Sequence, residues 1–315
     1  NSRVFLCGSG SESIDSAMKI ARTSQIQSGH PERSVIISRN RGYHGTNYGG
    51  TSAQGLPLNK VGYGTLLEGV LQVEADDIEA MSLLMSQNAH RLAAVITEPL
   101  QGAGGVFPPK EGYLQQLRKL CDQHGAYLIF DEVITGFGRL GTWFGAQYYG
   151  VTPDLLTFAK AVTSGYQPLG GVIMAPSVCA PLEADPAFLL RHGYTYSAHP
   201  IAAACALKTL EIVERDNYVG MAQKQGVLLH QLLQTHFADH PLVGEIRGQG
   251  LIGAVELVAD RDKPEAFDPS LKIAPRVAKR SMELGVITRA LPAADTVAFS
   301  PPFIVTDSEL ETMVK

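Results

Sequence analysis

The stretch from residue 127 to residue 160, YLIFDEVITGFGRLGTWFGAQYYGVTPDLLTFAK, contains two apolar runs that each end in a charged residue. Asp131 follows the first run and Lys160 follows the second. Short apolar runs of this kind are typical of buried β-strands. A charge at the end of a buried strand is destabilising unless it meets an opposite charge or hydrogen-bond donors. We therefore expect two core strands of a sheet here, with Asp131 and Lys160 in a functional site.

Strand-like and helix-like segments alternate on both sides of this stretch. Apolar residues recur at helical spacing after Ser9, and shorter apolar runs separate the expected helices. This alternation predicts an α/β fold, with a mostly parallel sheet and helices on both of its faces. Ligands bind such sheets beyond the carboxyl ends of the strands. The expected strands cover residues 35–37, 93–97, 126–130, 155–158 and 171–175, and the expected helices begin near residue 9 and cover 76–85 and 112–124.

The pattern changes after His199-Pro200. Long helical patterns are followed by short strand-like runs, which is typical of an α+β arrangement. The expected helices cover residues 201–213, 218–237 and 274–284, and the expected strands cover 243–247, 251–257 and 286–289. We expect a large domain over residues 1–210 and a smaller C-terminal domain over residues 211–315.

The composition excludes several classes of protein. The chain has 315 residues, of which 45% are hydrophobic, and a net charge of −5. Without a basic stripe, that balance argues against nucleic-acid binding. No run of about 18–20 apolar residues predicts a membrane span. The four cysteines are widely spaced without a CxxC pair, so we expect reduced core thiols in a cytoplasmic protein, with no metal site.

The segment Gly8-Ser9-Gly10-Ser11-Glu12 opens the first expected helix. Unpaired N–H groups at a helix N-terminus suit a phosphate, and serine hydroxyls add donors. The alternative is plain helix capping, since Ser9 and Glu12 have the spacing of a capping box. The segment lacks the third glycine of a dinucleotide fingerprint, which disfavours a dinucleotide-dependent oxidoreductase.

Further candidate residues lie at or beside the ends of expected strands. A desolvated lysine such as Lys160 has a lowered pKa and attacks an aldehyde readily. Asp131 suits a protonated pyridine nitrogen, although a metal ligand or a helix cap is an alternative. Glu98 ends the strand expected at 93–97 and is placed similarly. Tyr43, next to His44 and a glycine, suits stacking on a planar cofactor, or is a half-buried loop residue.

The segments that contain these candidate residues follow one another in the order found in the class III (ω-type) pyridoxal-phosphate (PLP) aminotransferases, and the chain resembles that family. The resemblance extends over nearly the whole chain and is most similar to the branch that acts on ω-amino acids and amines with pyruvate as acceptor. The matching segments are SGSES (9–13), YHG (43–45), EPLQGAGG (98–105), DEVITGFGR (131–139), TFAKAVTSGYQPLGG (157–171), GYTYSAHP (193–200) and RGQGL (247–251).

The resemblance implies a fold-type-I PLP-dependent transferase in which Lys160 forms the internal aldimine. It places Asp131 on the pyridine nitrogen, Val133 and Tyr43 on the two ring faces, and Glu98 near Asp131 and the ring hydroxyl. The other implied cofactor-binding residues are Ser9, Gly10 and Ser11 at the phosphate, His44 in the matched YHG segment, and Thr195 at a phosphate of the partner subunit.

Arg289 resembles the mobile arginine of the family, which meets a substrate carboxylate. Alternatively, it is an exposed charge at a strand end. The matched RGQGL segment begins with Arg247, for which we expect a structural role.

The expected reaction is a ping-pong transamination between an amine or amino acid and a keto acid, with Lys160 as the general base. A homodimer with shared active sites is expected. An aminomutase or a decarboxylating transaminase on the same scaffold is the alternative. A catalytically inactive PLP-binding fragment is a further one, because the chain starts only eight residues before the SGS loop, where family members carry a long segment.

Overall fold

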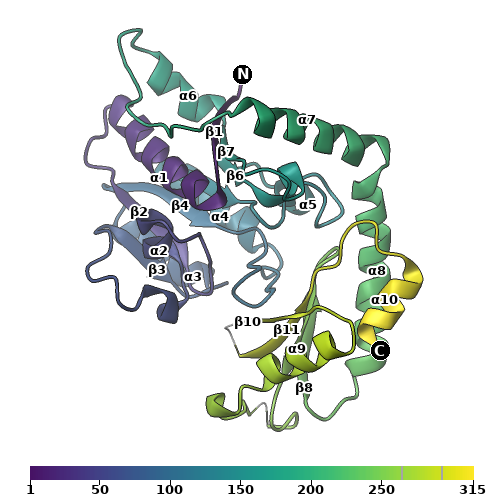
Figure 1. The fold of residues 1–315 in the computed structure, drawn as a ribbon. Helices are drawn as coiled ribbons and strands as arrows, with labels where there is room; N and C mark the ends of the chain where they lie inside the picture. The colour runs from purple at the N-terminus through teal and green to yellow at the C-terminus, as the bar shows by residue number, and fades with distance from the viewer. Residues whose placement is uncertain (264, 292–293) are drawn as a thin grey trace.

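A seven-stranded sheet is the centre of the fold in the computed structural model, which describes residues 1–263, 265–291 and 294–315 (Figure 1). The strand order is β1-β7-β6-β5-β4-β2-β3. Strand β7 is antiparallel to both of its neighbours, and the strands from β6 to β3 are parallel to one another. The strands are β1 (Arg3–Cys7), β2 (Val35–Arg39), β3 (Val70–Val73), β4 (Leu92–Thr97), β5 (Tyr127–Asp131), β6 (Leu155–Phe158) and β7 (Gly170–Met174).

Helices cover both faces of this sheet, as the alternating pattern predicts. Helices α1 (Gly10–Gln27) and α6 (Pro176–Glu183) pack on one face, where Ile129 of β5 joins their core. Helices α3 (Ile78–Gln87) and α4 (Tyr113–His124) pack on the other face, against Leu128 and Phe130. The alternation of these three β5 residues between two cores confirms a strand buried on both sides.

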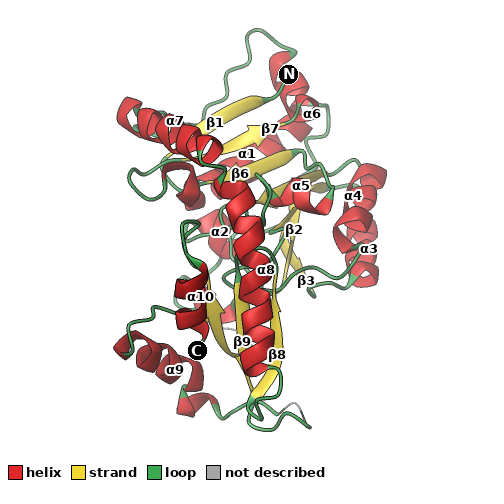
Figure 2. Cartoon of the chain, turned by 90° about the vertical axis from the view of Figure 1, so that its right-hand side faces the viewer, coloured by secondary structure: helices red, strands yellow, loops and turns green. Residues whose placement is uncertain are grey.

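A separate antiparallel sheet forms the C-terminal part, in the order β10-β11-β9-β8. Figure 2 shows the long helix α8 running beside β8 and β9. Leucines of α8 pack with residues of this sheet and of α10 in one core. The elements are α8 (Tyr218–Phe237), β8 (Val243–Gly248), β9 (Gly253–Leu257), α9 (Ile273–Glu283), β10 (Arg289–Leu291), β11 (Asp295–Phe299) and α10 (Asp307–Val314).

Helix α7 (Pro200–Arg215) precedes α8 and packs elsewhere. Its Ala202 and Ala206 lie in a core with Phe158 of the seven-stranded sheet. We therefore propose that the two domains join between α7 and α8, close to the boundary expected at residue 210. The remaining helices are α2 (Tyr48–Ala53) and α5 (Gly145–Tyr149), together with short 3-10 turns. Among the described residues, no helix is long and apolar enough to cross a membrane.

The sequence patterns did not predict three of the described strands, and they placed a fourth strand at the wrong residues. Strands β1, β3 and β11 were not expected; β1 and β3 are sheet edges whose partial exposure weakens the apolar signal. The strand expected at 286–289 is wrong, because β10 begins only at Arg289. The Val286 N–H donates instead to the Ser281 carbonyl at the end of α9, 2.9 Å away, which continues the helix end.

Candidate active site

Three strands of the seven-stranded sheet bring charged residues to one edge. Strands β4, β5 and β6 are parallel neighbours, and their carboxyl ends lead into Glu98, Asp131 and Lys160. These three residues line a cavity of about 150 Å³. Six other residues expected at the site also line it: Ser9, Gly10, Ser11, Tyr43, His44 and Val133.

The Asp131 carboxylate is buried, with a relative exposure of 5%, and it accepts hydrogen bonds on both oxygens. The His44 Nδ1 atom lies 2.9 Å from Oδ2. The Val133 N–H donates to Oδ1 at 3.1 Å, and the Thr157 hydroxyl donates to the same atom at 3.4 Å. Thr157 is the register partner of Asp131 on β6, so the sheet itself places this hydroxyl. Because its donors fix it, the carboxylate keeps one orientation.

Glu98 is also buried and is held by backbone donors. The Tyr43 N–H and the Gly102 N–H each donate to one of its carboxylate oxygens, both at 2.9 Å. Burial raises the pKa of Glu98 to about 7; the His44 ring lowers this pKa, and the nearby Asp131 raises it. Glu98 can therefore carry a proton near neutral pH.

Lys160 opens onto the cavity and has an exposed side chain. Desolvation by the surrounding protein nevertheless lowers the pKa of its ammonium group, Asp131 and Glu98 oppose that change, and Arg289 lowers the pKa further. The backbone φ of Lys160 is +48°, a left-handed conformation that few non-glycine residues adopt. Such strained residues cluster at functional sites, where the surrounding structure holds them in place.

The N-terminus of α1 forms another wall of the cavity. The Ser9 hydroxyl accepts from the Glu12 N–H at 3.2 Å, so the expected cap is present. Glu12 accepts from the Gly8 N–H at 2.6 Å rather than from Ser9, which differs from a strict capping box. The Ser11 hydroxyl accepts from the Thr46 N–H at 3.0 Å. Capping and a phosphate site are compatible here, because the helix end faces the cavity.

A glycine keeps part of the cavity open. A Cβ atom on Gly10 would lie 3.0 Å from Val133 Cγ1, so a side chain there would fill the space beside Val133. The cavity thus combines an amine with a lowered pKa, a buried carboxylate, an aromatic ring and a helix N-terminus. These groups fit PLP, a flat aldehyde with an anionic phosphate and a basic ring nitrogen.

Two expected site residues do not line this cavity. Thr195 is exposed, and Arg289 is exposed at the start of β10, although its charge acts on the Lys160 pKa. Conversely, Thr157 was missed, despite being the polar residue within an otherwise apolar strand. The lining residues that were not expected at the site are Ile14, Gly45 and Ile134, although Gly45 and Ile134 lie in the matched segments YHG and DEVITGFGR.

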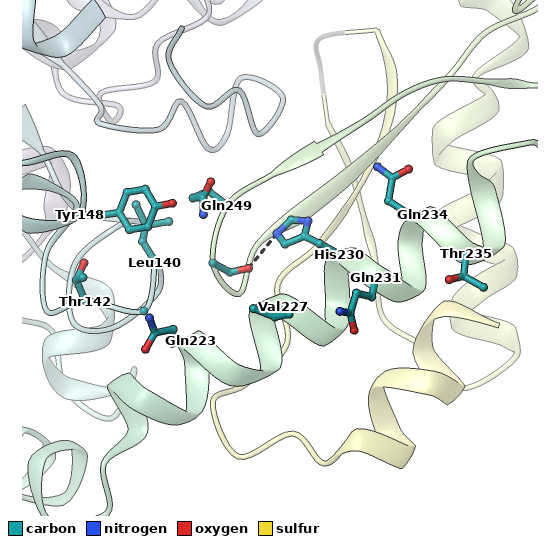
Figure 3. Close-up of a pocket in the computed structure, with 13 residues that line it drawn as sticks. Leu140, Thr142, Tyr148, Gln223, Val227, His230, Gln231, Gln234, Thr235 and Gln249 are labelled. Carbon is teal, nitrogen blue, oxygen red and sulfur yellow. Dashed lines mark hydrogen bonds between the residues drawn. The ribbon is translucent and has the colours of Figure 1, made fainter. Parts of the chain in front are cut away.

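A larger cavity, of about 700 Å³, lies between α8 and the turn at Leu140 (Figure 3). Several amide side chains from α8 line it, and His230 Nε2 lies 3.0 Å from the Gly250 carbonyl oxygen. Its described lining contains neither a lysine nor a carboxylate, so it lacks the groups of the smaller cavity. The smaller cavity is therefore the candidate active site.

Comparison with known proteins assigns the family. The sequence model for class III aminotransferases matches residues 1–315. The beta-alanine–pyruvate aminotransferase of Pseudomonas aeruginosa is 39% identical, over 98% of this chain and 72% of that protein. The diaminobutyrate–2-oxoglutarate transaminase of Halomonas elongata is 35% identical, over 99% of this chain and 72% of that protein.

The fold has close counterparts among solved structures. An amine transaminase from an uncultivated Pseudomonas species, solved in the PLP-bound internal aldimine form, superposes with a TM-score of 0.94. Its sequence is 38% identical, and the match covers 99% of this chain and 74% of that one. The fold, the site and these likenesses lead to one conclusion: the chain belongs to the class III aminotransferases, the PLP-dependent transaminases with a mostly parallel fold-type-I sheet.

Proposed function

We propose that this transaminase moves the amino group of an ω-amino acid or a primary amine to pyruvate. The observation that carries the proposal is the position of Lys160 in one cavity with Asp131 and Glu98. Relatives named for pyruvate support the acceptor, among them the putrescine–pyruvate aminotransferase of Pseudomonas aeruginosa, which is 34% identical.

Lys160 is proposed as the residue that holds PLP and moves protons. Bound PLP supplies an aldehyde that reacts with amines and a ring that withdraws electrons from the substrate carbon. The lowered pKa leaves a larger share of Lys160 Nζ unprotonated and nucleophilic near neutral pH. Once the incoming amine has freed it, this Nζ would accept the proton from the donor carbon. It would then give that proton to the C4′ position of the cofactor, so that Lys160 acts as both base and acid.

The two carboxyl groups have different proposed tasks. Asp131, fixed by His44 and Thr157, would keep the ring nitrogen protonated. Glu98, whose pKa is raised to about 7, would hold a proton beside the ring hydroxyl.

The other proposed contacts complete the site. Ser9, Gly10 and Ser11 would bind the phosphate at the N-terminus of α1, and Tyr43 and Val133 would pack on the ring. Arg289 would meet a substrate carboxylate. An aminomutase or a decarboxylating transaminase on this scaffold would need the same residues, so the reaction products distinguish these alternatives.

We further propose a homodimer in which Thr195 binds a phosphate of the partner subunit. Thr195 is exposed and outside the cavity of its own chain. Large side chains nearby in the sequence are also exposed: Tyr196 at 76% and Ile201 at 61%. Exposed apolar groups beside such a segment suit a subunit contact with two-fold symmetry.

A cytoplasmic location is also proposed, because all four cysteines are free thiols. Recovery of the native protein from a secreted fraction would contradict it.

The Asp131→Asn variant should lose transaminase activity. The amide keeps the shape of the side chain but removes the negative charge, so kcat should fall by about 10² or more. A matched control is Asp154→Asn, which alters a carboxylate that accepts from the Leu128 N–H and pairs with Arg118. The control should lower the free energy of unfolding by roughly 1–3 kcal/mol and leave kcat near native. Equal losses of kcat in both variants would contradict the role of Asp131.

The acceptor can be tested by product analysis. We expect the PLP-loaded enzyme to convert pyruvate to alanine with an ω-amino acid or amine as donor, without release of CO₂. Alanine can be measured by chromatography with each donor in turn. Turnover with 2-oxoglutarate and none with pyruvate would contradict the proposed acceptor, and CO₂ release would favour the decarboxylating alternative.

The dimer can be tested by light scattering of the PLP-loaded protein. We expect twice the mass of one chain, and weaker PLP binding in the Thr195→Ala variant. A single-chain mass at the assay concentration, with full activity and native PLP affinity, would contradict the shared site.

A further inference from the structure

Two arginines, Arg247 buried and Arg139 half-buried, connect the small sheet to loops that follow β4 and β5. Arg139, beyond the end of β5, donates to the Leu251 and Pro301 carbonyls at 2.8 and 2.7 Å. Arg247, on β8 of the small sheet, donates from Nε to the Gly105 carbonyl beyond β4, at 2.8 Å. Each connected loop follows a strand that leads into a carboxylate of the cofactor cavity.

Arg247 is buried, and every nitrogen of its guanidinium group has a partner. Its relative exposure is 7%, and Nη1 pairs with both Glu245 and Glu256, which neutralise its charge. Nη2 donates to the Thr296 hydroxyl at 3.1 Å. Its Cζ atom lies 4.0 Å from the centroid of the Phe107 ring, a cation–π contact. The planar guanidinium therefore has a partner for each of its nitrogens, which a lysine cannot reproduce.

The loop that Arg247 contacts is a closed turn. Gln101 and Phe107 exchange both backbone hydrogen bonds, at 3.0 and 2.9 Å. Inside the turn, the Gly102 carbonyl accepts from the Gly105 and Val106 N–H groups, at 3.2 and 3.0 Å. The Gly102 N–H, on the same peptide turn, donates to the Glu98 carboxylate. Gly105 and Glu98 are thus connected through two hydrogen bonds, one from the Gly105 N–H to the Gly102 carbonyl and one from the Gly102 N–H to Glu98.

We propose that Arg247 is a positioning residue for the cofactor site: by holding Gly105 and Phe107, it fixes the Gly102 N–H that orients Glu98 beside Asp131 and Lys160. Arg247 does not line the cavity, so it acts through the turn. This inference rests on the proposed role of Glu98.

The same contact couples the two parts of the chain. Arg289, proposed to meet a substrate carboxylate, begins β10 in the sheet that contains Arg247. Strand β10 pairs with β11, which pairs with β9, the neighbour of β8. Arg289 and Arg247 therefore lie in one hydrogen-bonded sheet, which connects the proposed substrate contact with the support of Glu98.

The protonation of Glu98 gives a readout of this contact. The hydrogen bond from Gly102 stabilises the charged carboxylate and lowers its pKa, so loss of that donor raises the pKa further. The pH midpoint of the Glu98 carboxyl itself, followed in the PLP-loaded protein by its carbonyl infrared band, should then move to higher pH. The charged and titratable groups around Glu98 are unchanged by the variants used: His44, Asp131, Lys160 and Arg39.

The test compares three variants of the whole chain. Arg247→Lys keeps the positive charge for Glu245 and Glu256 but loses the Nε–H donor. Phe107→Leu keeps Arg247 and removes the aromatic ring, which covers the case in which the lysine variant fails to fold. Glu245→Gln is the matched control, because it removes one ion pair of Arg247 and leaves the Gly105 contact in place.

Hydrogen exchange by mass spectrometry on the PLP-free protein reports directly on the turn. In Arg247→Lys and Phe107→Leu, peptides covering residues 99–108 should exchange about tenfold faster than in the native chain, the effect of one lost buried hydrogen bond. In the PLP-loaded protein, the dissociation constant of PLP should rise about tenfold, and the pH midpoint should increase. Glu245→Gln should match the native chain in all three measurements.

Native exchange of residues 99–108 in Arg247→Lys and Phe107→Leu would overturn the proposal. Faster exchange with unchanged PLP affinity and pH midpoint would also overturn it, since the turn would then not position Glu98. A native chain that never binds PLP covalently would instead defeat the proposed function, and the exchange result would remain valid for the turn.

Discussion

The Asp131 carboxylate, buried at the end of a parallel strand, is the constraint on which the site depends. A carboxylate with a relative exposure of 5% is tolerated only where donors replace the lost water. Val133 donates from the loop directly after β5, and the other two donors come from separate parts of the chain: His44 from the loop after β2, and Thr157 from β6. Holding this charge therefore brings together the elements that form the cavity.

The pKa of the second carboxyl group, Glu98, depends on the first. Glu98 is close enough to Asp131 for the negative charge to oppose its ionisation, and burial adds to that effect. A fixed carboxylate beside a readily protonated acid is the arrangement on which the proposed roles of Asp131 and Glu98 rest. Lys160, with its lowered pKa and left-handed backbone, completes an arrangement that only a rigid scaffold maintains.

Sequence patterns predicted the parts of this arrangement that depend on local order. The apolar runs before Asp131 and Lys160 gave the strands, and the serine at position 9 gave the helix start, which the structure confirms. The partner of His44 could not be predicted, because its contact with Asp131 joins residues 87 positions apart. Edge strands such as β1 also escaped, since half-exposed strands carry a weaker apolar signal.

Contacts between the two sheets also could not be predicted from local sequence patterns. Arg247 was expected to be structural, but its contact with Gly105 spans 142 positions and depends on how the sheets pack. The roles of Thr195 and Arg289 stay predictions from the resemblance, because neither residue lines the cavity. Periodicity and caps report on neighbours along the chain, whereas a site depends on which loops meet.

Identifying the amine that holds the cofactor tests the proposed role of Lys160 directly. Borohydride reduction of the PLP-loaded protein, followed by digestion and mass spectrometry, locates the pyridoxyl label on a single peptide. We expect a label on Lys160 and loss of the yellow absorbance on reduction. A label on another lysine, or no label at all, would contradict it.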